Sequence, residues 1–319
     1  MLPDGRRLGL HLPMATGMVK AVDRAHAIGA DALQIFVDNP TAWRRREEPP
    51  TELAAFVARA AALDLGPTAI HASYLVNLAG ADTELVGRSA TLLRSELQVA
   101  PSFGARFVNM HIGSHRDTSV AEGTVRLADE IAGVLADVDD GPDAAQLVLE
   151  NSAGSGSGFG TDVTEIAGIA EAIAARGVAA HRVGFCLDTA HAWSAGIDLS
   201  TIDGVDAFLD AFHRRIGLDR LVMLHLNDSK VDLGSRIDRH EHLGAGQIGA
   251  IGLRRLLTHP GLRHATAYLE TPGMDEGYDA VNVSRAYDIA AGQPLAELPP
   301  EAMTVRGSRA RTAPAEVSS

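Results

Sequence analysis

The sequence is poor in cysteine, in aromatic residues and in positive charge. Its 319 residues include one cysteine, Cys186, which excludes an internal disulfide and favours a reducing compartment. Aromatic residues make up only 4% of the chain, so aliphatic side chains must supply most of the core. With 28 basic and 41 acidic residues, the net charge is −13. This charge argues against a protein that binds nucleic acid through overall positive charge.

Long apolar runs are also lacking. No stretch of about 18 apolar residues occurs, so we expect no membrane span and no membrane partner. The N-terminal stretch MLPDGRRLGLHLP has no long apolar segment typical of a signal peptide. Together these absences favour a cytoplasmic protein. Hydrophobic residues nevertheless make up 46% of the chain and charged residues 22%, which is enough for a sizeable core and excludes global disorder.

Short apolar runs alternate with amphipathic segments along almost the whole chain. Helical spacing of apolar residues is found, for example, in segments 17–29, 83–104 and 163–177. The strand-like runs are LGLHL (8–12), ALQIF (32–36), TAIHA (68–72), RFVNMHI (106–112), QLVLEN (146–151), RVGFCLD (182–188), LVMLHLND (221–228) and AYLET (267–271). Apolar strands that alternate with helices predict a parallel sheet covered on both faces.

Eight such units predict an α/β fold of the closed (β/α)₈ TIM barrel type. An open, doubly wound sheet is the alternative that the pattern leaves. No composition break or linker divides residues 1–295, so we expect a single domain there. From residue 296 to 319 the sequence is polar, proline-bearing and aperiodic, which predicts a disordered C-terminal tail.

Acidic and imidazole side chains gather where the predicted strands end. In a barrel of this type the active site lies at the C-terminal ends of the strands. Six of the eight strands end in a histidine or a carboxylate, and three more such residues follow the sixth and seventh strands. These nine candidates are His71, His111, Glu150, Asp188, His191, His225, Asp238, His240 and Glu270.

Cations would make such a cluster stable, because many carboxylates in a low-dielectric site cannot all ionise without them. Imidazole mixed with carboxylate, without thiolate, indicates Zn²⁺, Mn²⁺ or Fe²⁺. Nine ligands are too many for one ion, so we expect two or three. Asp238 and His240 stand two apart, and alternate positions of an extended segment point to the same side.

Clustered metals favour phosphate-ester hydrolysis. Two ions about 3.5–4 Å apart activate a shared water and bind the attacking and leaving oxygens of an in-line displacement. Metal-assisted isomerisation or epimerisation of a sugar or sugar phosphate is the alternative, since it uses similar sites on barrels.

Several motifs occur together in order and at defined spacing. They are IHASYLVNLAG (70–80), HIGSH (111–115), LENSAG (149–154), CLDTAH (186–191), LHLNDSK (224–230), GSRIDRHEHLGAGQIG (234–249) and LETPG (269–273). From about residue 8 to 292 the sequence resembles the endonuclease IV family of zinc-dependent apurinic/apyrimidinic endonucleases. The resemblance implies a hydrolase of base excision repair that cleaves double-stranded DNA 5′ to an abasic site, through attack of a metal-bound hydroxide on phosphorus.

The resemblance further implies a monomer with three zinc ions, with Mn²⁺ or Fe²⁺ possible at one or more sites. Glu150 corresponds to the carboxylate that bridges two ions, and is the residue on which catalysis would depend. His71 and His111 would complete the first site with it; Asp188, His225 and Glu270 the second; and His191, Asp238 and His240 the third. The nearby His11 and His242 match no family ligand, so we expect both to be structural or to line the pocket.

Substrate contacts are implied at six positions. Asn227 and Lys230 match the family pattern beside the site, and Tyr74 matches a residue that contacts DNA. In the loop at 36–50, Asn39 and Trp43 are kept, and Arg44 begins a run of three arginines. Phosphate contact and an ordinary solvated charge run are equally good interpretations of that run.

The same loop departs from the family. Its members push polar and basic side chains into the DNA stack, whereas here Asp38 replaces a usual lysine and Pro-Thr-Ala follows at 40–42. Loss of these groups weakens extrusion of a damaged nucleotide. A repurposed family member that acts on another phosphate ester, or that binds DNA without cleavage, is therefore a further alternative.

Overall fold

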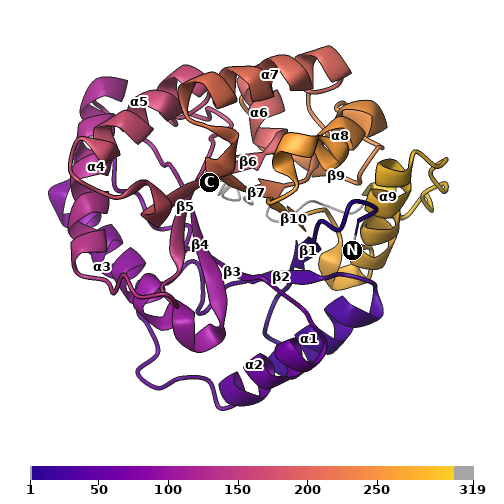
Figure 1. Cartoon of the computed structure of the whole chain (residues 1–319), viewed down its shortest axis with the longest axis horizontal. Coiled ribbons are helices and arrows are strands. Elements are labelled where there is room, and N and C mark those ends of the chain that lie inside the picture. The colour runs from indigo at the N-terminus through magenta and orange to yellow at the C-terminus, as the bar shows by residue number, and fades with distance from the viewer. Residues whose placement is uncertain (1, 305–319) are drawn as a thin grey trace, which may run out of the picture.

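The computed structural model describes residues 2–304, whose parallel strands form a closed barrel inside a ring of helices (Figure 1). The barrel strands are β1 (Leu8–His11), β2 (Ala32–Ile35), β3 (Thr68–His71), β4 (Ala105–His111), β5 (Gln146–Glu150), β6 (Val183–Asp188), β7 (Leu221–His225) and β10 (Thr266–Leu269). Their order around the barrel is β1-β10-β7-β6-β5-β4-β3-β2. Each lies within one of the predicted runs or within one residue of it. Because β1 pairs with both β2 and β10, the sheet is closed, and the open-sheet alternative is wrong.

Helices cover the outer face of the barrel. They are α1 (Met18–Ala27), α2 (Leu53–Ala62), α3 (Thr83–Val99), α4 (Val120–Ala136), α5 (Val163–Ala174), α6 (Thr189–Ala195), α7 (Ile202–Arg215), α8 (Gly249–Thr258) and α9 (Asp279–Ala291). Short 3₁₀ helices are η1 (Ala100–Phe103), η2 (Ala180–Arg182), η3 (Leu218–Arg220), η4 (Pro260–Leu262), η5 (Met274–Glu276) and η6 (Ala302–Thr304). Side-chain caps start several helices; at α4, Ser119 and Glu122 form a capping box.

A small antiparallel hairpin, which the sequence did not predict, follows β7. Its strands are β8 (Asp228–Ser229) and β9 (His240–Glu241), and Ser229 pairs with His240. The buried Asp228 carboxylate accepts hydrogen bonds from the backbone N–H groups of Gly244, Gly246 and Ile248 at 2.9–3.1 Å. These bonds fix the turn that leads from the hairpin into α8.

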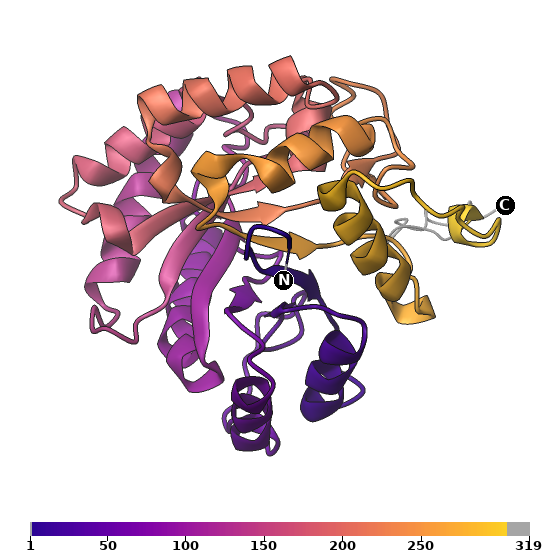
Figure 2. The same ribbon diagram turned by 45° about the vertical axis from the view of Figure 1, so that its right-hand side comes forward.

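The C-terminal segment leaves α9 and runs away from the barrel strands (Figure 2), and the carbonyl of Ala296 accepts a hydrogen bond from Arg285 of α9. Residues 296–304, which the sequence assigns to the tail, end in η6, and Ala302 is fully buried. The rest of the predicted tail, 305–319, lies outside the described residues. Across 2–304, no helix is long and apolar enough to cross a membrane.

Candidate metal centre

The pleat of the strands determines which side chains enter the barrel. Residues two apart on a strand point to the same side. One inward layer is largely apolar and consists of Ala32, Ala69, Phe107, Val148, Cys186, Met223 and Tyr268. Two residues further along each strand, the next inward layer is polar and consists of Gln34, His71, Asn109, Glu150, Asp188, His225 and Glu270. Strand register alone therefore concentrates polar groups at the C-terminal mouth of the barrel.

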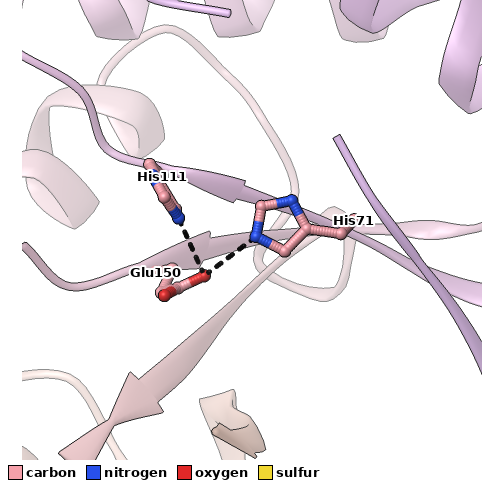
Figure 3. Close-up of side chains that lie close together, drawn as sticks. All are labelled: His71, His111 and Glu150. Atoms are coloured by element: carbon pink, nitrogen blue, oxygen red, sulfur yellow. Dashed lines mark ion pairs between the residues drawn. The ribbon is translucent and has the colours of Figure 1, made fainter. Parts of the chain in front are cut away.

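At this mouth, a first group consists of His71, His111 and Glu150, which come from β3, β4 and β5. Figure 3 shows both imidazoles directed at one carboxylate oxygen: Nε2 of His71 and of His111 each lie 3.7 Å from Glu150 Oε2. Their ligand atoms all lie within 4.8 Å of one another, so one cation could contact all three residues.

A second group shares Glu150 with the first and adds Asp188, His225 and Glu270. His225 Nδ1 lies 3.4 Å from Glu150 Oε1 and 3.2 Å from Glu270 Oε2. Glu150, Asp188 and His225 are completely buried. The shared Glu150 gives this pair of groups the arrangement of a carboxylate-bridged site.

A third group consists of Asp188, His191 and His240. Asp238 covers it from the solvent side: its carboxylate oxygens lie 3.2 Å from His191 Nε2 and 3.0 Å from His240 Nε2. The resemblance placed Asp188 in the second site alone, whereas the structure brings it within reach of both groups. All nine residues selected from the sequence thus lie in one continuous cluster.

Without cations, only histidines of the cluster can offset its carboxylates: despite the opposing effect of burial, neighbouring acidic groups raise the pKa of His191, His225 and His240. Burial by itself raises the pKa of Glu150, but His225, His111 and His191 lower it well below the usual range, so the carboxylate is ionised. Burial, with help from His111, lowers the pKa of His71 to about 3, which leaves this imidazole neutral and able to bind a metal. An ionised, fully buried carboxylate beside a neutral imidazole suits a divalent cation.

Unpaired polar atoms support this fit. Among the residues that the structure describes, Glu150 Oε1, His225 Nδ1 and His240 Nε2 are buried and form no hydrogen bond of good geometry. Leaving such groups without a partner costs about 1–3 kcal/mol each. All three point into the groups described above, where a bound metal would satisfy them.

Three of the candidate histidine ligands are each held in place by a hydrogen bond from ring nitrogen Nδ1. Through Nδ1, His71 donates to the backbone carbonyl of Ala72, His191 to that of Asn151 and His240 to that of Glu270, at 2.7–3.0 Å. Each bond fixes the tautomer and leaves Nε2 to face the cluster. Metal-binding histidines characteristically have such partners.

Buried amides, which the sequence analysis missed, bond to the acidic residues of the cluster: Asn109 to a carboxylate and Asn151 to the backbone. Asn109 donates to Glu150 Oε2 at 2.6 Å, and Asn151 accepts from the backbone N–H of Asp188 at 2.7 Å. The sequence does contain a signal for Asn109. In RFVNMHI it stands two residues before His111, so both side chains point into the barrel. Nothing comparable identifies Asn151.

Asn227 has a different role from the one expected. It is fully buried, donates to Asp188 Oδ2 at 2.7 Å and accepts from the backbone N–H of Glu270 at 2.9 Å. Both ends of its amide are engaged by candidate ligands, so direct substrate contact is a wrong expectation. Asn227 joins the ends of β6 and β10 instead.

Two other expected contacts lie near the rim. The Tyr74 side chain is half exposed, and its ring packs beside Phe36 and His71 at centroid distances of 5.2 and 5.5 Å. Lys230 lies 3.6 Å from Glu241 in the hairpin. Tyr74 therefore presents a ring face or edge to any ligand above the first group.

The loop at 36–50 is anchored by one exposed ion pair and one largely buried ion pair. Arg46 pairs with Asp38 at 2.7 Å, and Arg45 pairs with the buried Glu96 of α3 at 3.0 Å. The interpretation of the three arginines as one solvated run is therefore wrong for Arg45, whereas Arg46 is exposed but paired with Asp38. The Asp38 that replaces a family lysine serves as their counter-ion, Arg45 lying 3.7 Å away.

The remaining residues of that loop are divided between surface and core. Arg44 is almost fully exposed, 3.9 Å from Glu47. Asn39 is exposed and accepts two hydrogen bonds from Thr41 in a local turn. Trp43 packs against the core, with the guanidinium of Arg88 4.3 Å from its ring centroid.

The two unassigned histidines differ in position. His11 Nδ1 lies 3.0 Å from Glu270 Oε1, so this ring lines the cluster. His242 faces away, towards Asn282 and the carbonyl of Ala302, and joins the hairpin to the C-terminal segment. That neither histidine binds metal stays a prediction.

The closed barrel with a His/Asp/Glu cluster at its mouth is of the xylose isomerase-like TIM barrel class, whose family model matches residues 22–293. Probable endonuclease 4 of Halothermothrix orenii is 39% identical over 282 residues, covering 88% of this chain and 99% of the relative. Probable endonuclease 4 of Methanoculleus marisnigri is 38% identical, and the match covers 89% of this chain and 98% of the relative. The crystal structure of endonuclease IV from Thermus thermophilus matches with a TM-score of 0.74 at 38% identity. The match covers 88% of this chain and 98% of that chain. The chain belongs to the endonuclease IV family.

Proposed function

We propose that this protein is a metal-dependent phosphodiesterase that cleaves double-stranded DNA 5′ to abasic sites. The observation that carries the proposal is the overlap of the three ligand groups, which share Glu150 and Asp188. Shared carboxylates hold cations close together, as hydrolysis of a phosphodiester requires. The endonuclease 4 relatives support a nuclease and a DNA substrate.

The donor set favours Zn²⁺, with Mn²⁺ or Fe²⁺ as alternatives, because it combines imidazole and carboxylate without thiolate. His71, His111 and Glu150 would hold one ion; Asp188, His225 and Glu270 a second with Glu150; and His191, Asp238 and His240 a third with Asp188. When bound, the ions would supply Lewis acidity to the attacking water and the leaving oxygen.

The protein's own groups would orient the substrate. Tyr74 lies beside the first group, where its exposed ring can stack on a base or sugar at the lesion. Arg44, exposed on the neighbouring loop, and Lys230 would contact phosphates. Asn39 and Trp43 would shape that loop, Asn39 through its turn and Trp43 through the core.

A second candidate function is suggested by the loop at 36–50. Asp38 lies within ion-pair distance of both Arg45 and Arg46 and so engages them within the loop, which disfavours their insertion into DNA. A family member acting on a different phosphate ester, or binding DNA without cleavage, would need no insertion. The sugar epimerase alternative has weaker support, since a D-tagatose 3-epimerase-like protein is only 15% identical and shares the fold alone.

The test is cleavage of a labelled duplex that carries one tetrahydrofuran abasic analogue, beside an undamaged duplex. Zinc-loaded protein should nick 5′ to the analogue, chelation should abolish the nick, and Glu150→Gln should lower the rate by at least about 100-fold, because a bridging ligand is lost. Absence of a nick from protein shown to contain the metals would contradict the proposal. Binding to the same duplex without a nick would favour the second candidate.

A further inference from the structure

Gln34 is the polar residue of the inward layer on β2, and it is fully buried. In the closed barrel, β1 and β10 separate β2 from β7. The Gln34 side chain nevertheless reaches across the interior to the candidate ligands His225 and Glu270. A purely structural glutamine would more simply bond to backbone groups of its own neighbourhood.

The orientation of the Gln34 amide follows from its partners. Glu270 is a carboxylate and only accepts, so the amide nitrogen must face it; Nε2 lies 2.8 Å from Glu270 Oε1. The amide oxygen, which can only accept a hydrogen bond, then faces His225 Nε2 at 3.0 Å. His225 must therefore carry a proton on Nε2.

This bond decides which nitrogen of His225 can bind a metal. With Nε2 donating to Gln34, only Nδ1 can act as a ligand. Nδ1 is the atom that faces Glu150 Oε1 and Glu270 Oε2, and it lacks a well-formed hydrogen bond within the described part of the chain. His71, His191 and His240 instead present Nε2 and bond to backbone carbonyls through Nδ1.

The same amide orients the carboxylate of Glu270. Gln34 and His11 both lie within 3.0 Å of Oε1, which leaves Oε2 directed at the second group, 3.2 Å from His225 Nδ1. One side chain thus controls the donor atoms of two candidate ligands that come from different strands.

We propose that Gln34 is a positioning residue of the second group, which selects His225 Nδ1 as a ligand atom and directs Glu270 Oε2. The proposal rests on the proposed metal-dependent function. Outer-shell partners of this kind typically contribute 10–100-fold to metal affinity or activity. Loss of Gln34 should therefore weaken one metal site selectively and leave the first group, which it does not contact, intact.

Two variants separate the two bonds. Gln34→Met has a similar volume and removes both. Gln34→Glu is isosteric and can still accept from His225, but it replaces the donor to Glu270 with a second carboxylate. The matched control is Gln146→Met on β5, because the Gln146 amide donates to the carbonyl of His181 rather than to a candidate ligand.

The measurements need no DNA. Zinc per chain is determined after dialysis against graded concentrations of a chelator, and the tautomer of His225 is determined by ¹⁵N NMR of histidine-labelled, zinc-loaded protein. Gln34→Met should lose one zinc at chelator concentrations about 10–100-fold lower than the wild type, and its His225 should lose the pure Nε2–H tautomer. Gln34→Glu should lose the same zinc early but keep that tautomer.

Wild-type zinc retention and an unchanged His225 signal in folded Gln34→Met would overturn the proposal. If Gln34→Met does not fold, as judged by circular dichroism, Gln34→Glu decides: zinc retention equal to the Gln146→Met control would overturn it. A lack of endonuclease activity leaves these measurements unaffected, so failure of the proposed function and failure of the positioning role are distinguishable.

Discussion

At the scale of single residues, the centre depends on amides as much as on its candidate ligands. Asn227, Asn109 and Gln34 each bond to at least one carboxylate of the cluster and hold it in one orientation. Their positions follow from strand register, but an amide has no sequence pattern that marks it as a partner of metal ligands. The nine ligand positions could be selected from the sequence because histidine and carboxylate recur at strand ends; the buried amides could not.

Asn227→Ala should destabilise the protein even without metal. The substitution leaves the Glu270 N–H without its acceptor and Asp188 Oδ2 without its donor, inside the protein. We expect a loss of about 1–3 kcal/mol in the free energy of unfolding, measured by urea denaturation in chelator. Asn39→Ala, at an exposed turn, is the control and should change it by less than about 0.5 kcal/mol. Equal effects of the two substitutions would show that the Asn227 bonds contribute nothing.

At the scale of elements, the strands and helices were largely predictable and the loops were not. The eight strands could be predicted because buried parallel strands are near-continuous apolar runs, as VGFCLD in β6 illustrates. The hairpin β8–β9 is two residues per strand and depends on the buried Asp228, so no periodicity marks it. The buried ion pair of the 36–50 loop joins residues far apart in sequence, Arg45 and Glu96, so no local pattern predicts it.

Glu96 should make stability depend on pH. Burial raises its pKa to about 7 from an ordinary 4.5, and the ion pair with Arg45 offsets only part of this. The folded state therefore binds this proton more tightly, and stability falls as pH rises from about 4.5 to 7. Between pH 5 and 8, the free energy of unfolding of the wild type should fall by up to about 3 kcal/mol more than that of Glu96→Gln, measured by urea unfolding. The exposed Glu84→Gln on the same helix should keep the wild-type slope; a wild-type slope in Glu96→Gln would disprove the prediction.

Asp38→Asn should strengthen DNA binding. It removes a negative charge and releases Arg46, whose side chain is already partly exposed, from its 2.7 Å pair. We expect several-fold tighter binding to duplex DNA and a salt dependence steeper by about one phosphate contact. Fluorescence anisotropy at several salt concentrations measures both. The control is Asp23→Asn, which breaks a comparable pair with Arg59 on α1 and α2; identical effects of the two variants would refute a specific role for the loop.

At the scale of the whole molecule, the net charge of −13 and a DNA substrate are compatible, because four of the acidic residues belong to the candidate centre. Bound cations would neutralise these carboxylates and leave the mouth of the barrel locally positive. Metal binding should then also contribute to folding, since the nine residues come from the ends of six strands, from α6 and from the segment after β7.

Removal of metal should lower the thermal unfolding midpoint. A ligand present at about 100 times its dissociation constant stabilises the folded state by about 2.7 kcal/mol. We therefore expect a midpoint several degrees higher with zinc than with chelator, and rising with zinc concentration, measured by calorimetry. In Glu150→Gln the dependence on zinc should be strongly reduced. A midpoint that is insensitive to zinc in wild type would argue against a resident metal.

The spread of the candidate ligands along the chain has a consequence for biosynthesis. The first group, His71, His111 and Glu150, is complete once β5 has been synthesised, whereas the second also needs Glu270, which follows β10. Glu150 is common to both. A nascent chain emerging from the ribosome therefore carries all the donors of its first group long before the barrel can close, and the second group forms only when β10 pairs with β1 and β7.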